Sequence, residues 1–150
     1  MTAAVVDLRA LMGELTDFFA PQAEAAGVVL RTAVPESPVP AHVDGKLLKQ
    51  AVLNLMLNAV QAMARGGELL MRLSGGRSQA VLEVIDTGPG IAPEKLPKVF
   101  QVYFSTKPGG SGLGLPTTRR IIREHGGDIR VESALGKGTR FVITLPLAKG

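Results

Sequence analysis

The stretch QAVLNLMLNAVQAM, residues 50–63, decides how the fold of this chain is interpreted. It predicts a helix from about Gly45 to Ala64 that is apolar on nearly every face, which is typical of a buried helix. The exceptions are four amides, at Gln50, Asn54, Asn58 and Gln61, whose spacing of four, four and three puts them on one face. A buried amide without a partner costs about 1–3 kcal/mol. We interpret the amide face as the lining of a polar cavity that could ligate a hard cation such as Mg²⁺, with a solvated face or an internal amide ladder as the alternatives.

Periodicity and turn residues predict the elements around this helix. Asp7 is expected to cap a first helix, which Pro21 should kink or end. Strands are predicted at 28–34, around 39–43, on both sides of a glycine turn at Gly75-Gly76, and in a hairpin over 128–147. Pro93 is expected to open a short helix, and another helix should end near His125. The pattern predicts one α+β domain over residues 1–150, a two-layer sandwich whose mixed, mostly antiparallel sheet is covered on one face by three helices.

Composition excludes several classes of protein. With 150 residues, 45% of them hydrophobic, the chain is sized for one well-packed domain. The absence of cysteine excludes disulfides, thiolate metal sites and a cysteine nucleophile. The start lacks the pattern of a signal peptide, and the most apolar run is too short to span a bilayer, so we expect a cytoplasmic domain without direct membrane contact. A net charge of +4 is spread along the chain without interleaved aromatic residues, so we do not expect nucleic-acid binding.

A carboxylate ends one of the predicted strands. In VLEVIDTGPGI, Asp86 follows the strand residues and precedes two closely spaced glycines, Gly88 and Gly90. Such a carboxylate can accept a hydrogen bond from an exocyclic amine, and the glycines allow the backbone to approach a flat ring. An ordinary aspartate-containing turn is the alternative.

Glycines also lead into the third predicted helix, in FSTKPGGSGLGLPTTRRII, residues 104–122. Gly109 and Gly114 have the spacing of a P-loop, but Leu115 and Pro116 stand where that motif needs Lys and Ser or Thr. The placement of the glycines also excludes the dinucleotide-binding fingerprint. A flexible linker is one interpretation, and a helix start whose backbone N–H groups face a phosphate is the other.

Five motifs in this order resemble the ATP-binding catalytic domain of sensor histidine kinases, in the superfamily of DNA gyrase, the mismatch-repair ATPases and the related heat-shock chaperones. The stretch at 50–63 resembles the asparagine box, DTGPGI the first glycine box, VFQVYFSTK the phenylalanine box, GGSGLGL the second glycine box, and GKGTRFVITLP the terminal strand motif. The likeness covers essentially the whole chain and is greatest to kinases of the nitrogen-sensor type. It implies the Bergerat-type ATP-binding fold, with ATP and Mg²⁺ as cofactors.

The resemblance implies roles for individual residues. Asn58 would be the Mg²⁺ ligand, and Asn54, one turn earlier, would be catalytic together with Lys107, which approaches the phosphates. Asp86 would hold the adenine amino group, assisted by Thr139 through a water. Phe100 and Phe104 would anchor a lid over the nucleotide. The nucleotide-binding set would be Asn58, Gln61, Asp86, Gly88, Gly90, Ile91, Phe100, Lys107, Gly110, Gly112, Leu113, Gly114 and Thr139.

Three positions bear on this assignment. Val102 replaces the proline of the usual F-x-P-F pattern, and Gln61 stands where many members carry Lys or His. Hydrolytic members carry Glu where this chain has Asn54, and an amide cannot act as a general base. Asn54 therefore favours phosphoryl transfer over hydrolysis.

The phosphoacceptor histidine of such a kinase lies in a separate dimerisation domain. Neither His42 nor His125 has the surroundings of an acceptor, and His125 is expected to cap a helix C-terminus. We therefore expect a monomeric catalytic domain, with little activity alone, whose partners are the dimerisation domain of the same kinase and a downstream response regulator. The parent protein could be membrane-anchored. The alternatives are a stand-alone serine or threonine kinase of the same superfamily and a non-catalytic nucleotide-binding module.

Overall fold

The computed structural model describes residues 1–101 and 114–149. Seven strands and three α-helices follow one another in these ranges, with one short 3₁₀ turn. Their bounds are β1 (Ala4–Asp7), α1 (Leu8–Ala25), β2 (Val28–Ala33), β3 (Pro40–Val43), α2 (Gly45–Ala62), β4 (Gly67–Gly75), β5 (Gln79–Asp86), η1 (Leu96–Lys98), α3 (Gly114–Glu124), β6 (Asp128–Ser133) and β7 (Thr139–Pro146).

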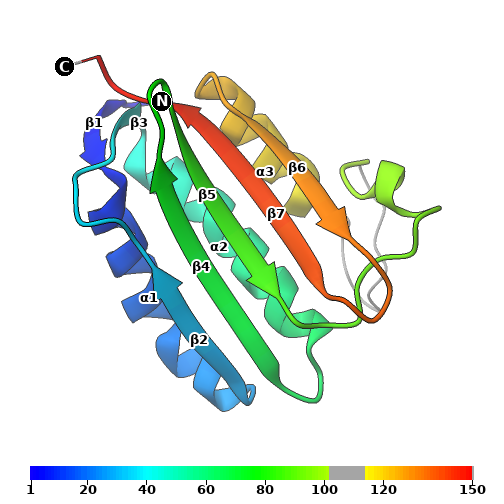
Figure 1. Cartoon of the computed structure of the whole chain (residues 1–150). Coiled ribbons are helices and arrows are strands. Elements are labelled where there is room, and N and C mark those ends of the chain that lie inside the picture. Colours follow the sequence, from blue (N-terminus) through cyan, green and yellow to red (C-terminus); the bar gives the residue numbers. More distant parts are fainter. Residues whose placement is uncertain (102–113, 150) are drawn as a thin grey trace.

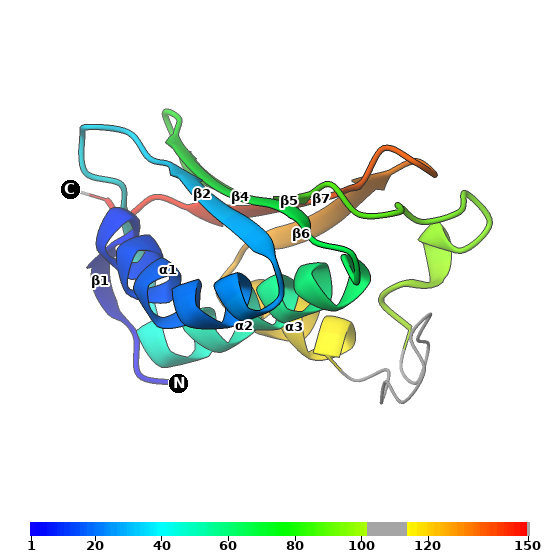
Figure 2. The same ribbon diagram turned by 90° about the horizontal axis from the view of Figure 1, so that it is seen from below.

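Five of these strands form one sheet in the order β2-β4-β5-β7-β6 (Figure 1). The pair β2–β4 is parallel and the other three pairs are antiparallel. Figure 2 shows all three helices on one side of this sheet, so the molecule has two layers. The predicted α+β sandwich with its mixed, mostly antiparallel sheet is therefore confirmed. None of the helices in the described ranges is long and apolar enough to cross a membrane.

The core lies between the sheet and the inner face of α2. Asp44 caps this helix by accepting hydrogen bonds from the backbone N–H groups of Lys46 and Leu47. The buried side chains of α2 are Leu48, Ala51, Val52, Leu55, Met56 and Ala59, and they recur at helical spacing. The helix is buried as predicted on its apolar face, and of its four amides Gln50 and Gln61 are exposed while Asn54 and Asn58 are half-buried.

Three local predictions differ from the structure. The strand β1 was not predicted; its four residues pair antiparallel with the distant β3, and Val6 packs against the core. Of the two outcomes expected at Pro21, a kink or an end, the end does not occur: α1 continues to Ala25, because Asp17 and Pro21 lie on the exposed side, where water can replace the missing hydrogen bond. Pro93 does not open a helix; only the short 3₁₀ turn at Leu96–Lys98 forms there, and Pro97 has no N–H with which to extend it.

Candidate functional site

Strand alternation brings Asp86 to the helix-covered face of the sheet. Successive side chains of a strand point to opposite faces, so Asp86 shares its face with the buried Leu82 and Val84. It is the last residue of β5, and its side chain is only 7% exposed. The end of α2 lies beside it, since the Thr87 hydroxyl contacts the sulfur of Met63 at 3.7 Å. A carboxylate is therefore held at the rim of the core, next to the helix that carries the amides.

The surroundings of Asp86 disfavour its charge. Burial raises the pKa of its carboxyl group, and the backbone N–H groups of Gly88 and Thr139 act in the opposite direction. The Gly88 N–H donates to Oδ1 at 2.9 Å. Among the described residues, no lysine or arginine forms an ion pair with it. A buried carboxylate without a cationic partner is a candidate for a functional group.

A hydroxyl cluster faces the same end of the sheet. Thr139 is paired with Asp86 in the β5–β7 register, and its Oγ1 lies 2.9 Å from Oγ of Ser133. The Ser133 hydroxyl donates to the carbonyl of Gly138 at 2.7 Å and accepts from the backbone N–H of Ile91 at 2.8 Å. Because serine has one hydroxyl proton, Thr139 must be the donor to Ser133. The lone pairs of Thr139 Oγ1 are then oriented to accept another hydrogen bond.

At two positions of the turn after Asp86, the structure explains in different ways why the residue is glycine. A Cβ at Gly88 would lie 3.0 Å from Oδ1 of Asp86 and 3.3 Å from Cγ of Met63, so a side chain there would crowd the carboxylate. Gly90 has φ +78°, and a Cβ there would overlap the carbonyl of Ala134 in the β6–β7 hairpin. Gly90 is therefore required by packing of the turn, and its predicted contact with a ring stays a prediction.

The amides of α2 do not all line one space. Asn54, half-buried, donates from Nδ2 to Oγ1 of Thr118 in α3 at 3.4 Å, and Thr118 donates to the carbonyl of Ala51 at 3.3 Å. Asn58 is also half-buried, and Gln61 is exposed. Gln50 instead lines a groove on the α1 side of the helix. The structure therefore does not put Gln50 into one cavity lining with Asn54: Gln50 lines the groove toward α1, whereas Asn54 contacts α3.

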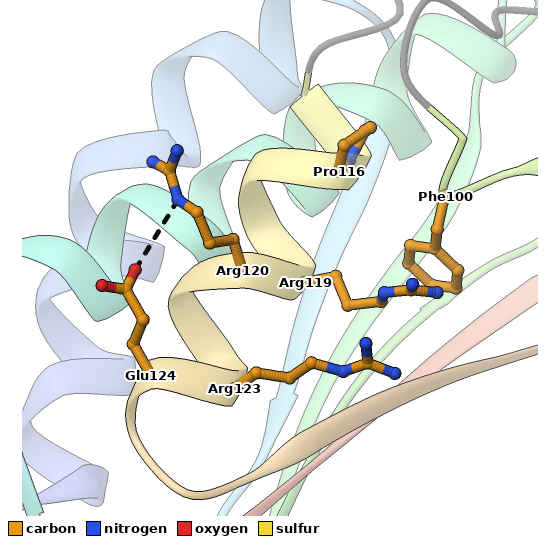
Figure 3. A pocket seen from close by; sticks show the side chains of 6 residues that line it. All are labelled: Phe100, Pro116, Arg119, Arg120, Arg123 and Glu124. Atoms are coloured by element: carbon orange, nitrogen blue, oxygen red, sulfur yellow. Dashed lines mark ion pairs between the residues drawn. The ribbon is translucent and has the colours of Figure 1, made fainter.

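Phe100 is held between the sheet and α3 (Figure 3). Its ring meets that of Phe141 edge to face, with centroids 6.2 Å apart, and the guanidinium of Arg119 lies 5.3 Å from its centroid. The sequence reasoning did not assign Arg119 to the site. Its only sequence signal is its place one turn into the helix that follows the glycine loop.

Several predicted site residues lie outside the described ranges. They are Lys107, Gly110, Gly112 and Leu113, together with Phe104 and Val102 of the phenylalanine box. Gly114 is described as the first residue of α3, and Pro116 lies in the first turn of that helix.

Neither histidine is placed as an exposed nucleophile on a helix. His42 is an exposed residue of β3. His125 Nδ1 lies 2.7 Å from the carbonyl of Ile121, and Nε2 accepts from the backbone N–H of Asp44 at 3.0 Å. An acceptor Nε2 requires the neutral ring with its proton on Nδ1. The predicted capping role of His125 is confirmed, and both of its nitrogens are engaged.

The two-layer fold is of the type found in the catalytic domains of histidine kinases, and comparisons with known proteins agree. Residues 43–149 match the family described as histidine kinase-, DNA gyrase B- and HSP90-like ATPase. The chain belongs to this family.

Individual relatives are sensor kinases. The chain is 36% identical over 148 residues to the sensor histidine kinase ZraS of Salmonella typhi, which covers 98% of this chain and 32% of that protein. The nucleotide-free catalytic domain of histidine kinase ThkA is similar, with a TM-score of 0.88 and 28% identity over 97% of this chain and 98% of that one. Full-length ShkA in complex with AMPPNP matches all of this chain, with 32% of its own length covered, at 29% identity and a TM-score of 0.89. The fold is that of a histidine kinase catalytic domain, and the chain spans about a third of the length of ZraS.

Proposed function

We propose that this domain binds ATP with Mg²⁺ and donates the γ-phosphoryl group to a histidine of a separate dimerisation domain, as one step of two-component signal transduction. The observation that carries the proposal is the buried carboxylate of Asp86, which has no cationic partner among the described residues and lies beside α2. Full-length ShkA, which shares this fold, was determined with AMPPNP, an ATP analogue.

Adenine recognition would rest on Asp86. Its ionised carboxylate can accept a hydrogen bond from the exocyclic amine of adenine, which compensates for the lost hydration. The free lone pairs of Thr139 Oγ1 suit a water that bridges to the ring. Gly88 leaves room for the ring, because a side chain there would lie against the carboxylate.

Mg²⁺ would be held by the side-chain oxygen of Asn58 together with ATP phosphates and water. Asn58 fits this role because it is half-buried on α2, its amide oxygen is a hard ligand, and Mg²⁺ in nucleotide sites takes few protein ligands beside water and substrate phosphates. Bound Mg²⁺ would neutralise charge on the phosphates.

Catalysis of the phosphoryl transfer would depend mainly on how the donor and the acceptor are positioned. An imidazole nitrogen of the acceptor attacks the γ-phosphorus, the bond to the oxygen bridging the β- and γ-phosphorus breaks, and ADP leaves with that oxygen. Asn54 is tied to Thr118 and is an amide, so it cannot deprotonate water, which favours transfer over hydrolysis. Lys107 and the glycines at 110, 112 and 114 remain the proposed phosphate contacts.

The acceptor and the downstream partner would come from outside residues 1–150. The engagement of both His125 nitrogens and the position of His42 on a strand support this assignment. We assign the acceptor to the dimerisation domain of the same kinase and the next recipient to a response regulator. This domain would work in the cytoplasm, whether or not its parent is anchored in a membrane.

A chimera tests the proposal. The matching third of Salmonella typhi ZraS is replaced by this chain, and the product is incubated with Mg²⁺ and γ-labelled ATP. We expect acid-labile phosphate on the chimera but none on the isolated chain, although calorimetry should show that both bind ATP. Asn58→Ala should lose the Mg²⁺ dependence of binding. Acid-stable phosphate on serine or threonine would favour the alternative kinase, and an ATP-bound chimera without any transfer would favour a non-catalytic module.

A further inference from the structure

A groove between α1 and α2 lies away from the proposed nucleotide residues. It has a volume of about 470 Å³, and its apolar lining comes from Leu15 and Phe18 of α1 and Leu53 of α2. None of the proposed nucleotide residues lines it, and Asn54, one turn after Gln50, contacts Thr118 of α3 instead. A molecule bound in this groove would therefore not compete with a nucleotide held beside α3.

Phe18 is the unusual member of this lining. Its side chain is 70% exposed, whereas the other phenylalanines in the described ranges are buried or half-buried. The neighbouring Phe19 is fully buried in the core, so α1 does not need Phe18 for its own packing. Large aromatic side chains left exposed beside an apolar floor are typical of protein interaction sites.

The rim of the groove is basic. Lys46 and Lys49 stand one helical turn apart on α2 and line the same space. Lys49 pairs with Glu14 of α1 at 2.8 Å, while Lys46 forms no ion pair with any residue that the structure describes. The lining therefore carries two positive charges and one negative charge, and the uncompensated cation lies next to the apolar floor.

We propose that this groove docks an amphipathic helix of a protein partner, with apolar side chains against Phe18 and Leu53 and carboxylates opposite Lys46 and Lys49. A groove between two helices with an apolar lining suits the apolar face of an amphipathic helix, and the lysines beside it suit acidic side chains at the edge of that face. Charge complementarity selects an acidic helix over a basic one, because a basic helix would meet the unpaired Lys46.

The experiment uses a display library of 18-residue amphipathic helices. Positions flanking the apolar face are randomised among Glu, Gln and Lys, and the library is selected on the whole chain. We expect Glu to be enriched, and we expect Phe18→Ala to weaken the selected helices about tenfold or more. Val29→Ala is the matched control: Val29 is 49% exposed but lies on the sheet, and its side chain is on the other face from the helices, so binding should not change. Thermal unfolding of each variant shows whether it is folded.

Reversal of the rim charge sharpens the test. Lys46→Glu should weaken the helices selected on the wild-type chain, and a new selection on this variant should enrich Lys. The proposal is overturned if selection shows no charge preference, if no helix binds, or if selected helices bind Phe18→Ala as well as the wild-type chain. Sedimentation of the chain alone tests another occupant: a dimer that Phe18→Ala abolishes would assign the groove to a second copy and overturn the partner helix.

Discussion

Two carboxylates on β5 illustrate opposite uses of a buried acid. Glu83 and Asp86 are three residues apart, and each is 7% exposed, but they point to opposite faces of the sheet. Glu83 accepts from Arg72 at 2.8 and 3.0 Å and from Arg140 at 3.1 Å. Asp86 is bonded to backbone N–H groups and has no such cation among the described residues.

The difference appears in their pKa values. Hydrogen bonding to the Arg72 guanidinium lowers the pKa of Glu83, although burial opposes this, and the charge of Arg140 adds to it. Burial raises the pKa of Asp86. A paired carboxylate has its charge compensated within the sheet, whereas an unpaired one costs stability in the free protein and, under the proposed function, would gain a partner when ATP binds. Burial of an acid does not by itself distinguish a structural role from a functional one. A cationic partner within the fold, as at Glu83, indicates a structural role, and its absence at Asp86 among the described residues favours a functional one.

The largest expected effect is on nucleotide affinity. Asp86→Asn should weaken ATP binding about 10- to 100-fold, since a hydrogen bond to a charged group contributes about 1.5–3 kcal/mol. The asparagine can still accept from Gly88, so the turn should persist. Titration calorimetry measures the affinity, with Glu83→Gln as the matched control that should bind ATP normally. Equal losses in both variants would mean that the two acids do not differ in function.

The next effect is on stability. Glu83→Gln should reduce the free energy of unfolding by about 1–2 kcal/mol, less than for a fully buried pair, because Arg72 and Arg140 are partly exposed and water screens them. Asp86→Asn should leave stability unchanged or increase it at neutral pH, because it removes a desolvated charge. Urea unfolding of both variants measures these changes. A loss of stability in Asp86→Asn as large as in Glu83→Gln would contradict the comparison.

The smallest effects are on pH dependence and have opposite signs. The pKa of folded Glu83 is below its unfolded value of about 4.3. Its favourable contribution to the free energy of unfolding is therefore present above that value and is lost as pH falls through the folded pKa. The pKa of folded Asp86 is above its unfolded value of about 3.9. The stability that its ionisation costs the folded protein is therefore not lost at low pH, and it is lost as pH rises through the folded pKa.

Unfolding at several pH values from 3 to 7 measures this difference. The stability deficit of Glu83→Gln should shrink as pH falls below about 4.3, while any gain from Asp86→Asn should disappear on acidification. The wild-type chain serves as the reference at each pH. Parallel changes in the two variants would show that their environments are alike.

Much of the fold follows from local pattern. The helix capped by Asp7, the glycine turn at 75–76 and the C-terminal hairpin were all predicted, because capping, turn chemistry and periodicity act within a few residues. The strand β1 was missed because it forms by pairing with β3, more than 30 residues away in sequence.

For the site, the sequence alone predicted which side chains would carry the chemistry: the amides of α2, a carboxylate at the end of β5 and glycines before α3, all from residue type and spacing. Only the tertiary structure decided their surroundings. It gave Gln50 neighbours on α1 and Asn54 a partner on α3, and it gave Gly90 a packing role against Ala134. It also surrounded Glu83, but not Asp86, with arginines from neighbouring strands. Such pairings depend on strand register and on which face a residue occupies, and these arise only when segments distant in sequence are assembled.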